Sequence, residues 1–256
     1  MGVPVVALGI KGVTDPALEG LAGGLECFAL GQLNKPIDRL KAAGVRRAVM
    51  AGKVQHSSLF GGIMPDLRAI KVLASLRDKR TDTILRAIAD EFAKDGIELL
   101  PSTTFLSHLL VSEGVATKRK PTAEESADIR LGWAAAKAVA GFDIGQTVVV
   151  KGGAVIAVEA MEGTDAAILR ARDIARAHGR RTALTVVKVA KPQQDLRFDV
   201  PVLGLDSLQV FADAGVSALA VEAGTTLLFD KEEFLLRADR QKLSIIGLPA
   251  RGPEDQ

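Results

Sequence analysis

Cysteine is nearly absent from this chain, because Cys27 is the only one among 256 residues. A single cysteine excludes an intramolecular disulfide and a cluster of thiolate metal ligands, which is typical of a reducing compartment. Aromatic residues make up only 4%, and 33 basic residues nearly balance 31 acidic ones. Nucleic-acid surfaces need excess positive charge and aromatic rings for stacking, so we expect no nucleic-acid partner.

Long apolar runs are also lacking. No uncharged apolar stretch reaches the roughly 18 to 20 residues of a membrane-spanning helix, so we expect any membrane contact to be peripheral. The first eight residues lack the basic start and apolar run of a secretory signal. These absences favour a cytoplasmic protein that meets lipid only at a surface.

Length and hydrophobic pattern predict two α/β domains, since domains commonly have roughly 100 to 150 residues. In the first half, apolar runs at 3–10, 27–30, 48–51 and 97–100 alternate with helical patterns at 33–43, 66–77 and 82–95. This alternation predicts a Rossmann-like parallel sheet. We therefore expect an amino-terminal α/β domain at 1–110, a polar linker at 111–122 and a carboxy-terminal mixed α/β domain at 123–256.

Local signals in the second half are clear. Thr122 and Glu125 have the spacing of a capping box before a helix at 123–139. Two β-rich runs at 147–150 and 154–158 flank a Lys-Gly-Gly turn, which predicts a hairpin.

The polar loop after a predicted strand at 182–188 is the first candidate site. Residues 188–201 read KVAKPQQDLRFDVP. Lysine, arginine, amide and carboxylate groups on one loop can bind phosphates and hold a divalent cation, as cleavage of a phosphoanhydride requires. On residue types alone, an ordinary solvated loop is an equally good interpretation.

An acidic turn is the second candidate site. Glu159, Glu162 and Asp165 lie within one predicted strand-to-helix connection and offer oxygen ligands for Mg²⁺. The structural alternative is that Thr164 or Asp165 caps the following helix, since acidic residues favour helix N-termini.

Two weaker candidates lie in the first half. Gly52 and Lys53 follow a predicted strand, and Thr81 and Asp82 begin a predicted helix, so both pairs are placed to contact a ligand phosphate or base. The chain has no G-x-S-x-G elbow, Walker loop or H-E-x-x-H helix, which excludes the common serine hydrolase, kinase-like and zinc protease classes.

These motifs together resemble the UDP-2,3-diacylglucosamine pyrophosphatase family of lipid A biosynthesis. In the second half the similar segments are 143–146 (DIGQ), 158–165 (VEAMEGTD), 191–201 (KPQQDLRFDVP) and 221–224 (VEAG). In the first half they are 31–33 (GQL), 50–54 (MAGKV), 65–68 (PDLR) and 81–86 (TDTILR). The resemblance covers most of the chain.

The resemblance implies a cytoplasmic enzyme, peripheral to the inner membrane of a Gram-negative bacterium. It implies Mg²⁺-dependent hydrolysis of UDP-2,3-diacylglucosamine to UMP and 2,3-diacylglucosamine 1-phosphate, with water attacking the sugar-linked phosphorus. The family's essential aspartate matches Asp199, as Mg²⁺ ligand or water-orienting base. The implied metal ligands also include the three carboxylates of the acidic turn. The implied substrate contacts are Gly52, Lys53, Thr81, Asp82, Thr164, Lys188, Lys191, Gln194, Arg197 and Glu222. A homodimer is expected only as the commonest oligomer.

The start of the chain departs from the family pattern. The family opens with a strand and a glycine-rich turn, whereas this chain begins at what resembles the second strand, so we expect about one βα unit, up to roughly 30 residues, to be absent. Losing a central strand would uncover apolar surface and remove a ligand contact. The first alternative is therefore a non-catalytic protein that binds nucleotide sugar or lipid, and the second is a transferase that releases UDP.

Overall fold

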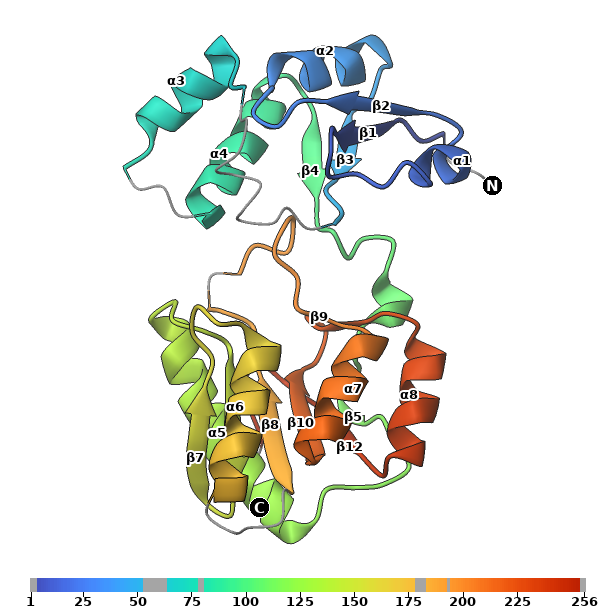
Figure 1. Ribbon diagram of the computed structural model, residues 1–256. Coiled ribbons are helices and arrows are strands. Elements are labelled where there is room, and N and C mark those ends of the chain that lie inside the picture. The colour runs from blue at the N-terminus through green and yellow to red at the C-terminus, as the bar shows by residue number, and fades with distance from the viewer. Residues whose placement is uncertain (1–3, 53–63, 78–80, 178–182, 193, 254–256) are drawn as a thin grey trace. The chain divides into compact units, whose positions relative to one another are not determined.

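The computed structural model describes residues 4–52, 64–77, 81–177, 183–192 and 194–253 (Figure 1). The chain divides into two compact units. The first is Met1–Thr104 together with Arg197–Asp199, and the second is Phe105–Leu196 together with Val200–Gln256. Both contain helices and strands, which confirms the predicted two-domain α/β fold class. Among the described helices, none combines the length and the apolar character needed to cross a membrane.

The first unit alternates strands and helices and pairs its strands in parallel, as the sequence predicts. Strand β1 pairs with β2 and β3 pairs with β4. The elements are β1 (Ala7–Ile10), α1 (Leu18–Ala22), β2 (Leu25–Phe28), α2 (Asn34–Ala42), β3 (Arg47–Val49), α3 (Leu67–Ser75), α4 (Thr81–Lys94) and β4 (Glu98–Leu100). Helix α1 is absent from the sequence prediction, because five residues are too few to display a helical period.

The core of the first unit forms where the inward faces of α2 and α3 meet residues at the strands. Ile37 and Leu40 of α2 are one helical turn apart and both are buried, as are Ala69 and Val72 of α3. They pack in one cluster with Ile97, which precedes β4. The three-residue spacing that predicts these helices therefore also identifies the faces that they bury.

The second unit contains the larger sheet. Its elements are a 3-10 helix (Ser107–Leu109), β5 (Gly114–Val115), α5 (Ala123–Gly141), β6 (Thr147–Lys151), β7 (Ala154–Val158), α6 (Thr164–Ala177), β8 (Leu184–Lys188), β9 (Val202–Leu203), α7 (Leu205–Ala214), β10 (Val216–Glu222), β11 (Leu227–Leu228), α8 (Lys231–Arg240) and β12 (Ser244–Leu248). Six strands form one sheet in the order β5-β12-β10-β8-β6-β7. Strands β8, β10 and β12 are parallel, while β5, β6 and β7 each run antiparallel to a neighbour. The sheet is therefore mixed, as predicted.

Helices cover both faces of this sheet. Side chains of α6, α7 and α8 form one apolar cluster with alternate strand residues such as Val149 and Val186. Side chains of α5 form a second cluster with the intervening residues, such as Val148 and Val187. This alternation follows from the two-residue period of a strand. Helix α5 packs closely, because a Cβ atom at Gly132 would lie 2.6 Å from Cγ2 of Val187.

Two local predictions in the second unit are confirmed. The Thr122 hydroxyl accepts a hydrogen bond from the Glu125 backbone N–H, and the Glu125 carboxylate accepts one from the Thr122 backbone N–H. Strands β6 and β7 form the predicted antiparallel hairpin. Its glycine turn is held by Asp128 of α5, whose carboxylate accepts hydrogen bonds from the backbone N–H groups of Gly152 and Gly153.

The segment 111–122, which the sequence analysis treats as a linker, carries structure of the second unit. It contains β5, which pairs with β12. Thr117 accepts a hydrogen bond from the Ile245 backbone N–H, and Arg119 donates to the Lys242 carbonyl. Polar residues of this segment form hydrogen bonds with backbone groups at the sheet edge. Composition alone cannot distinguish such residues from the polar residues of a flexible linker.

Candidate functional site

Polar and charged side chains gather at the carboxyl edge of the parallel strands in the second unit. Lys188 is the last residue of β8 and pairs in register with Val221, directly before Glu222 at the end of β10. Thr147, the first residue of antiparallel β6, pairs with Lys188 from the other side. All three polar side chains are buried. In open α/β sheets, ligands bind beyond the carboxyl ends of the strands.

Lys188, Thr164 and Glu159 form a cluster at this edge, in which the lysine and the glutamate are buried and the threonine is half-buried. The Lys188 ammonium donates a hydrogen bond to the Thr164 hydroxyl at 2.7 Å, and that hydroxyl donates to a Glu159 carboxylate oxygen at 2.8 Å. The other Glu159 oxygen accepts from the Gln146 backbone N–H at 3.3 Å. A charged side chain that is removed from water needs hydrogen-bonding partners of this kind. The structure therefore joins Lys188 of the polar loop to Glu159 and Thr164 of the acidic turn, which are two separate candidates in the sequence.

Glu222 is held by a lysine that the sequence analysis does not identify. One of its carboxylate oxygens accepts from the Lys137 ammonium at 2.5 Å and from the Ala190 backbone N–H at 3.0 Å. Lys137 comes from α5 and lies 5.5 Å from the centre of the Trp133 ring. Lys137 and Glu222 are 85 residues apart in the sequence, so no local pattern indicates this pair. The pair fixes the first residues of the loop that leaves β8.

Lys191 and Gln194, on the loop that leaves β8, make contacts within the second unit. The Lys191 ammonium pairs with the Asp143 carboxylate at 2.6 Å. The Lys191 backbone N–H donates to the Gln194 side-chain oxygen, and the Gln194 backbone N–H donates to the Lys191 carbonyl. Gln194 therefore closes a turn with its own side chain, a role that the sequence analysis does not foresee.

Arg197–Asp199 belong to the first unit, although the residues on either side belong to the second. The Ser102 hydroxyl lies within hydrogen-bonding distance of two carbonyl oxygens, 2.8 Å from that of Arg197 and 2.6 Å from that of Met50. The Arg197 guanidinium lies 5.6 Å from the centre of the Phe198 ring. The predicted catalytic residue, Asp199, is thus grouped with the first unit, whereas Lys188 and Glu222 lie in the second.

Comparison with known proteins identifies the family. The sequence profile of the LpxI N-terminal domain matches residues 1–109, and that of the LpxI C-terminal domain matches residues 112–246. The chain belongs to the LpxI family. It is also 34% identical over 245 residues to the UDP-2,3-diacylglucosamine pyrophosphatase LpxI of Caulobacter vibrioides. The matched region spans 93% of this chain and 86% of that enzyme.

The acidic turn of this LpxI family member does not form a carboxylate cage. Glu162 pairs with Arg170 at 2.6 Å, and its own backbone N–H and Arg170 lower the pKa of its carboxyl group. Asp165 lies in the first turn of α6. Across the described residues, no three His, Cys, Asp or Glu side chains are gathered to hold a metal. Glu159 accepts a hydrogen bond from the Thr164 hydroxyl, which in turn accepts one from the Lys188 ammonium. Because the positive charge of Lys188 is already close, this position disfavours a metal cation.

A single carboxylate still suits Mg²⁺ in an enzyme of phosphate esters. This ion is usually held by one or two carboxylates, with substrate phosphate oxygens and water completing its octahedron. The described residues therefore do not gather the carboxylates of the acidic turn into one metal site, and Asp199 stays a predicted ligand on the family resemblance.

The first-unit candidates are only partly described. Gly52 adopts a left-handed backbone with φ of 95° after β3, in the predicted turn. Lys53 lies outside the described residues. Thr81 and Asp82 begin α4 as predicted, but their side chains are not among those described.

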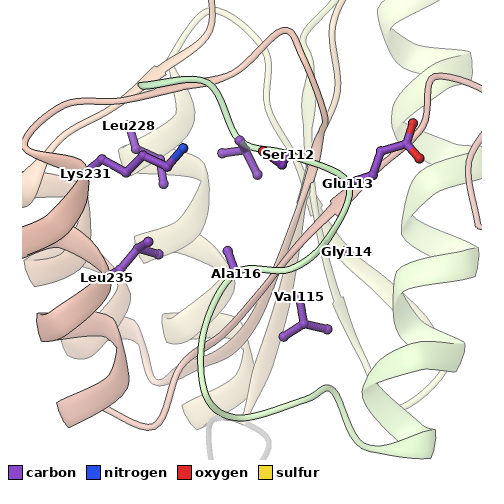
Figure 2. Close-up of a pocket in the computed structure, with 9 residues that line it drawn as sticks. Ser112, Glu113, Gly114, Val115, Ala116, Leu228, Lys231 and Leu235 are labelled. Carbon is purple, nitrogen blue, oxygen red and sulfur yellow. The ribbon is translucent and has the colours of Figure 1, made fainter. Parts of the chain in front are cut away.

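A hollow of about 200 Å³ lies elsewhere in the second unit (Figure 2). It is bounded by residues 111–116 and by Leu228, Lys231 and Leu235. The Lys231 ammonium donates to the carbonyl groups of His108 and Leu110, so this lysine closes the chain around the hollow. The described residues that line this hollow include none of the predicted site residues.

Proposed function

We propose that this LpxI family member hydrolyses the pyrophosphate bond of UDP-2,3-diacylglucosamine, giving UMP and 2,3-diacylglucosamine 1-phosphate in lipid A biosynthesis. The observation that supports this most strongly is the 34% identity, over nearly the whole chain, to an enzyme of that name. The buried charged cluster at the carboxyl edge of β8 is consistent with a site for a doubly charged pyrophosphate.

The described residues suggest how such a substrate is bound. Thr164 begins α6, and backbone N–H groups and the helix dipole at this end attract phosphate. Lys188 and Lys191 add cationic groups, each held in place by a neighbouring side chain. The Thr164 hydroxyl accepts from Lys188 and donates to Glu159, so the direction of its proton is fixed. Fixed dipoles of this kind need little reorganisation when charge develops.

We assign the chemical step to Asp199. Its carboxylate accepts the proton of the attacking water or orients that water toward the sugar-linked phosphorus, and UMP leaves. Mg²⁺, bound through Asp199 and substrate oxygens, would neutralise charge on the bridging and leaving oxygens. Lys188, Lys191, Gln194, Arg197 and Glu222 hold and orient the substrate in this proposal.

The proposed substrate carries two acyl chains, so we place the reaction at the cytoplasmic surface of a membrane, as a peripheral contact. We also propose a homodimer, on the general frequency of this symmetry alone. The non-catalytic alternative is not favoured, because the family profiles match both domains.

The test is product analysis with purified protein, detergent-solubilised UDP-2,3-diacylglucosamine and Mg²⁺. We expect UMP, and we expect oxygen from ¹⁸O-water in the lipid phosphate. Release of UDP would instead identify a transferase, and binding without product would identify a non-catalytic protein. Chelation of Mg²⁺ should stop UMP release.

Asp199→Asn should lower kcat about 10²- to 10⁴-fold with little change in KM, because it removes a proton acceptor and keeps the shape. Asp206→Asn, on the first turn of α7 and outside the predicted site, is the matched control. Equal UMP release by the two variants would refute the role of Asp199.

A further inference from the structure

The outward face of α3 in the first unit is apolar. Leu67, Ile70 and Ala74 follow one another at the three- and four-residue spacing of a helical stripe, and all three are exposed. Leu67 is 75% exposed and Ile70 is 48% exposed. Met64, just before the helix, is 68% exposed. A surface helix normally presents polar residues on this side, so the apolar stripe needs an explanation.

The amino-terminal end of α3 is fixed by its cap. One Asp66 carboxylate oxygen accepts from the Ala69 backbone N–H at 2.9 Å. The other accepts from the backbone N–H groups of Leu33 and Asn34, where α2 begins, at 2.8 and 2.7 Å. Burial opposes ionisation, but these N–H groups outweigh it and lower the pKa of Asp66. One carboxylate therefore ties two helix starts together.

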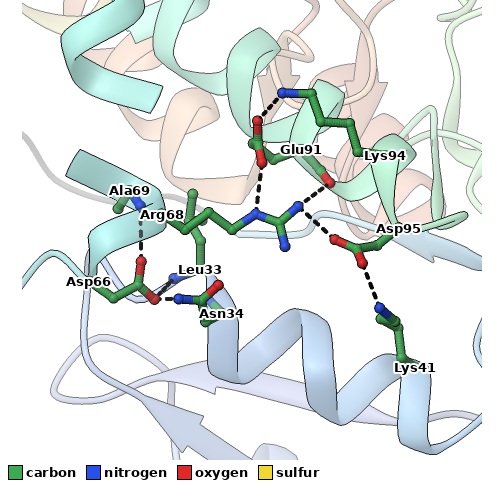
Figure 3. Close-up of polar contacts among 9 residues, drawn as sticks. All are labelled: Leu33, Asn34, Lys41, Asp66, Arg68, Ala69, Glu91, Lys94 and Asp95. Atoms are coloured by element: carbon green, nitrogen blue, oxygen red, sulfur yellow. Dashed lines mark hydrogen bonds and ion pairs between the residues drawn. The ribbon is translucent and has the colours of Figure 1, made fainter. Parts of the chain in front are cut away.

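The rotation of α3 is fixed by Arg68 (Figure 3). Its guanidinium pairs with Glu91 at 2.7 Å and with Asp95 at 2.6 Å, both near the end of α4. Lys41 of α2 holds the same Asp95 at 2.6 Å. Because these contacts and the buried Ala69 determine the inward side, the apolar stripe is held on the outward side.

The exposed charges beside this stripe are positive. Between residues 64 and 77, the exposed charged side chains are Lys71 and Arg77, and α3 contains no acidic residue. The acidic residues that contact Arg68 of α3 are Glu91 and Asp95, and both are paired with cations. Exposed apolar groups flanked by cations match the layers of an anionic lipid surface, where headgroups lie above acyl chains.

We propose that the outward face of α3, formed by Met64, Leu67, Ile70, Lys71 and Ala74, binds the surface of a bilayer that contains anionic lipids. The apolar side chains enter the boundary between headgroups and acyl chains, and Lys71 and Arg77 contact lipid phosphates. This surface deepens the proposed function, because a diacylated substrate resides in a bilayer. Its direct test needs no substrate.

The experiment is flotation of the full-length protein with vesicles of phosphatidylcholine, with and without phosphatidylglycerol. We expect binding to the anionic vesicles that weakens as salt is raised. Leu67→Glu with Ile70→Glu should weaken this binding about tenfold or more, since two apolar side chains no longer enter the bilayer. Lys71→Gln should weaken it about fivefold.

The matched control is Phe142→Glu with Leu236→Glu in the second unit. These residues are 80% and 51% exposed, close to the values for Leu67 and Ile70. The control should bind vesicles like the wild type. No vesicle binding by the wild type, or equal loss in the α3 and control variants, would overturn the proposal. A concentration-dependent dimer in light scattering that the α3 variant alone abolishes would instead identify a second copy as the occupant, and would also overturn it.

Activity separates this proposal from the proposed function. The α3 double variant should release UMP from detergent-solubilised substrate at the wild-type rate. Vesicle binding by a wild-type protein that releases no UMP would refute the function and leave the lipid surface intact.

Discussion

Neutralising Glu125 should destabilise the second unit in a pH-dependent way. Both oxygens of its carboxylate pair with the Arg119 guanidinium, at 2.8 and 3.0 Å, and the Glu125 side chain is only 12% exposed. Burial alone would raise the pKa of Glu125. The opposing hydrogen bonds from Arg119 and the Thr122 backbone N–H outweigh burial and lower the pKa from 4.5 to about 2. The ionised form is therefore strongly preferred in the folded protein.

The magnitude follows from this pKa. At about 1.4 kcal/mol for each tenfold change in proton affinity, the fall from 4.5 to about 2 corresponds to at most about 3.5 kcal/mol of folding free energy. The ion pair lines an open groove of about 510 Å³, so solvent screens part of it. We expect Glu125→Gln to cost about 1.5 to 2 kcal/mol at neutral pH.

The sign of the pH dependence is fixed. Because the folded pKa is lowered, the stabilisation is complete above the unfolded value of 4.5 and disappears as the pH falls toward 2. The difference between Glu125→Gln and the wild type should shrink over the same interval.

The assay is urea unfolding followed by fluorescence of Trp133, the single tryptophan, which is 5% exposed on α5. Glu124→Gln is the matched control, because Glu124 shares the first turn of α5 and its interaction with the helix dipole. Equal costs for the two variants, or a difference that persists at pH about 2, would refute the reasoning.

Three further changes test the packing and the site. Gly132→Ala should lower the free energy of unfolding by about 1 to 3 kcal/mol despite alanine's better helix propensity, because the new methyl meets Val187; a stabilised variant would contradict this packing. Asp66→Ala should cost about 1 to 3 kcal/mol and speed hydrogen exchange at the start of α2, and unchanged protection there would show that the carboxylate does not tie the two helices. Lys188→Met should cost about 3 to 5 kcal/mol, because the buried Glu159 carboxylate loses the ammonium that reaches it through the Thr164 hydroxyl. Adding Glu159→Gln should recover part of that loss, and strictly additive costs in urea unfolding would argue against coupling.

Local sequence signals predict the elements well where the stabilising contacts are themselves local. The capping box of α5 is one such case, since Thr122 and Glu125 are three residues apart and satisfy each other's backbone groups. The β6–β7 hairpin is another, because its turn residues are adjacent in the chain. The polar segment 111–122 is different, because its partners lie more than a hundred residues later.

The candidate site shows the same limit. Sequence and family resemblance name Lys188, Thr164 and Glu159, and the structure joins them through one hydroxyl. The contact of Lys137 with Glu222 is not predictable, since a lysine on a helix face is ordinarily solvated. The acidic turn illustrates the converse, because Glu159 and Glu162 are close in sequence but take separate partners, Thr164 and Arg170.

The grouping of Arg197–Asp199 with the first unit has a consequence for how the protein is made. The rest of that unit ends at Thr104, so a ribosome must synthesise most of the second unit before the first receives its last members. Domains generally acquire their structure in order as the nascent chain emerges. Here the earlier unit is complete in sequence only after residue 199 has been synthesised. A gene divided between codons 104 and 105 would therefore encode two fragments, and the first would lack the aspartate assigned to its chemistry.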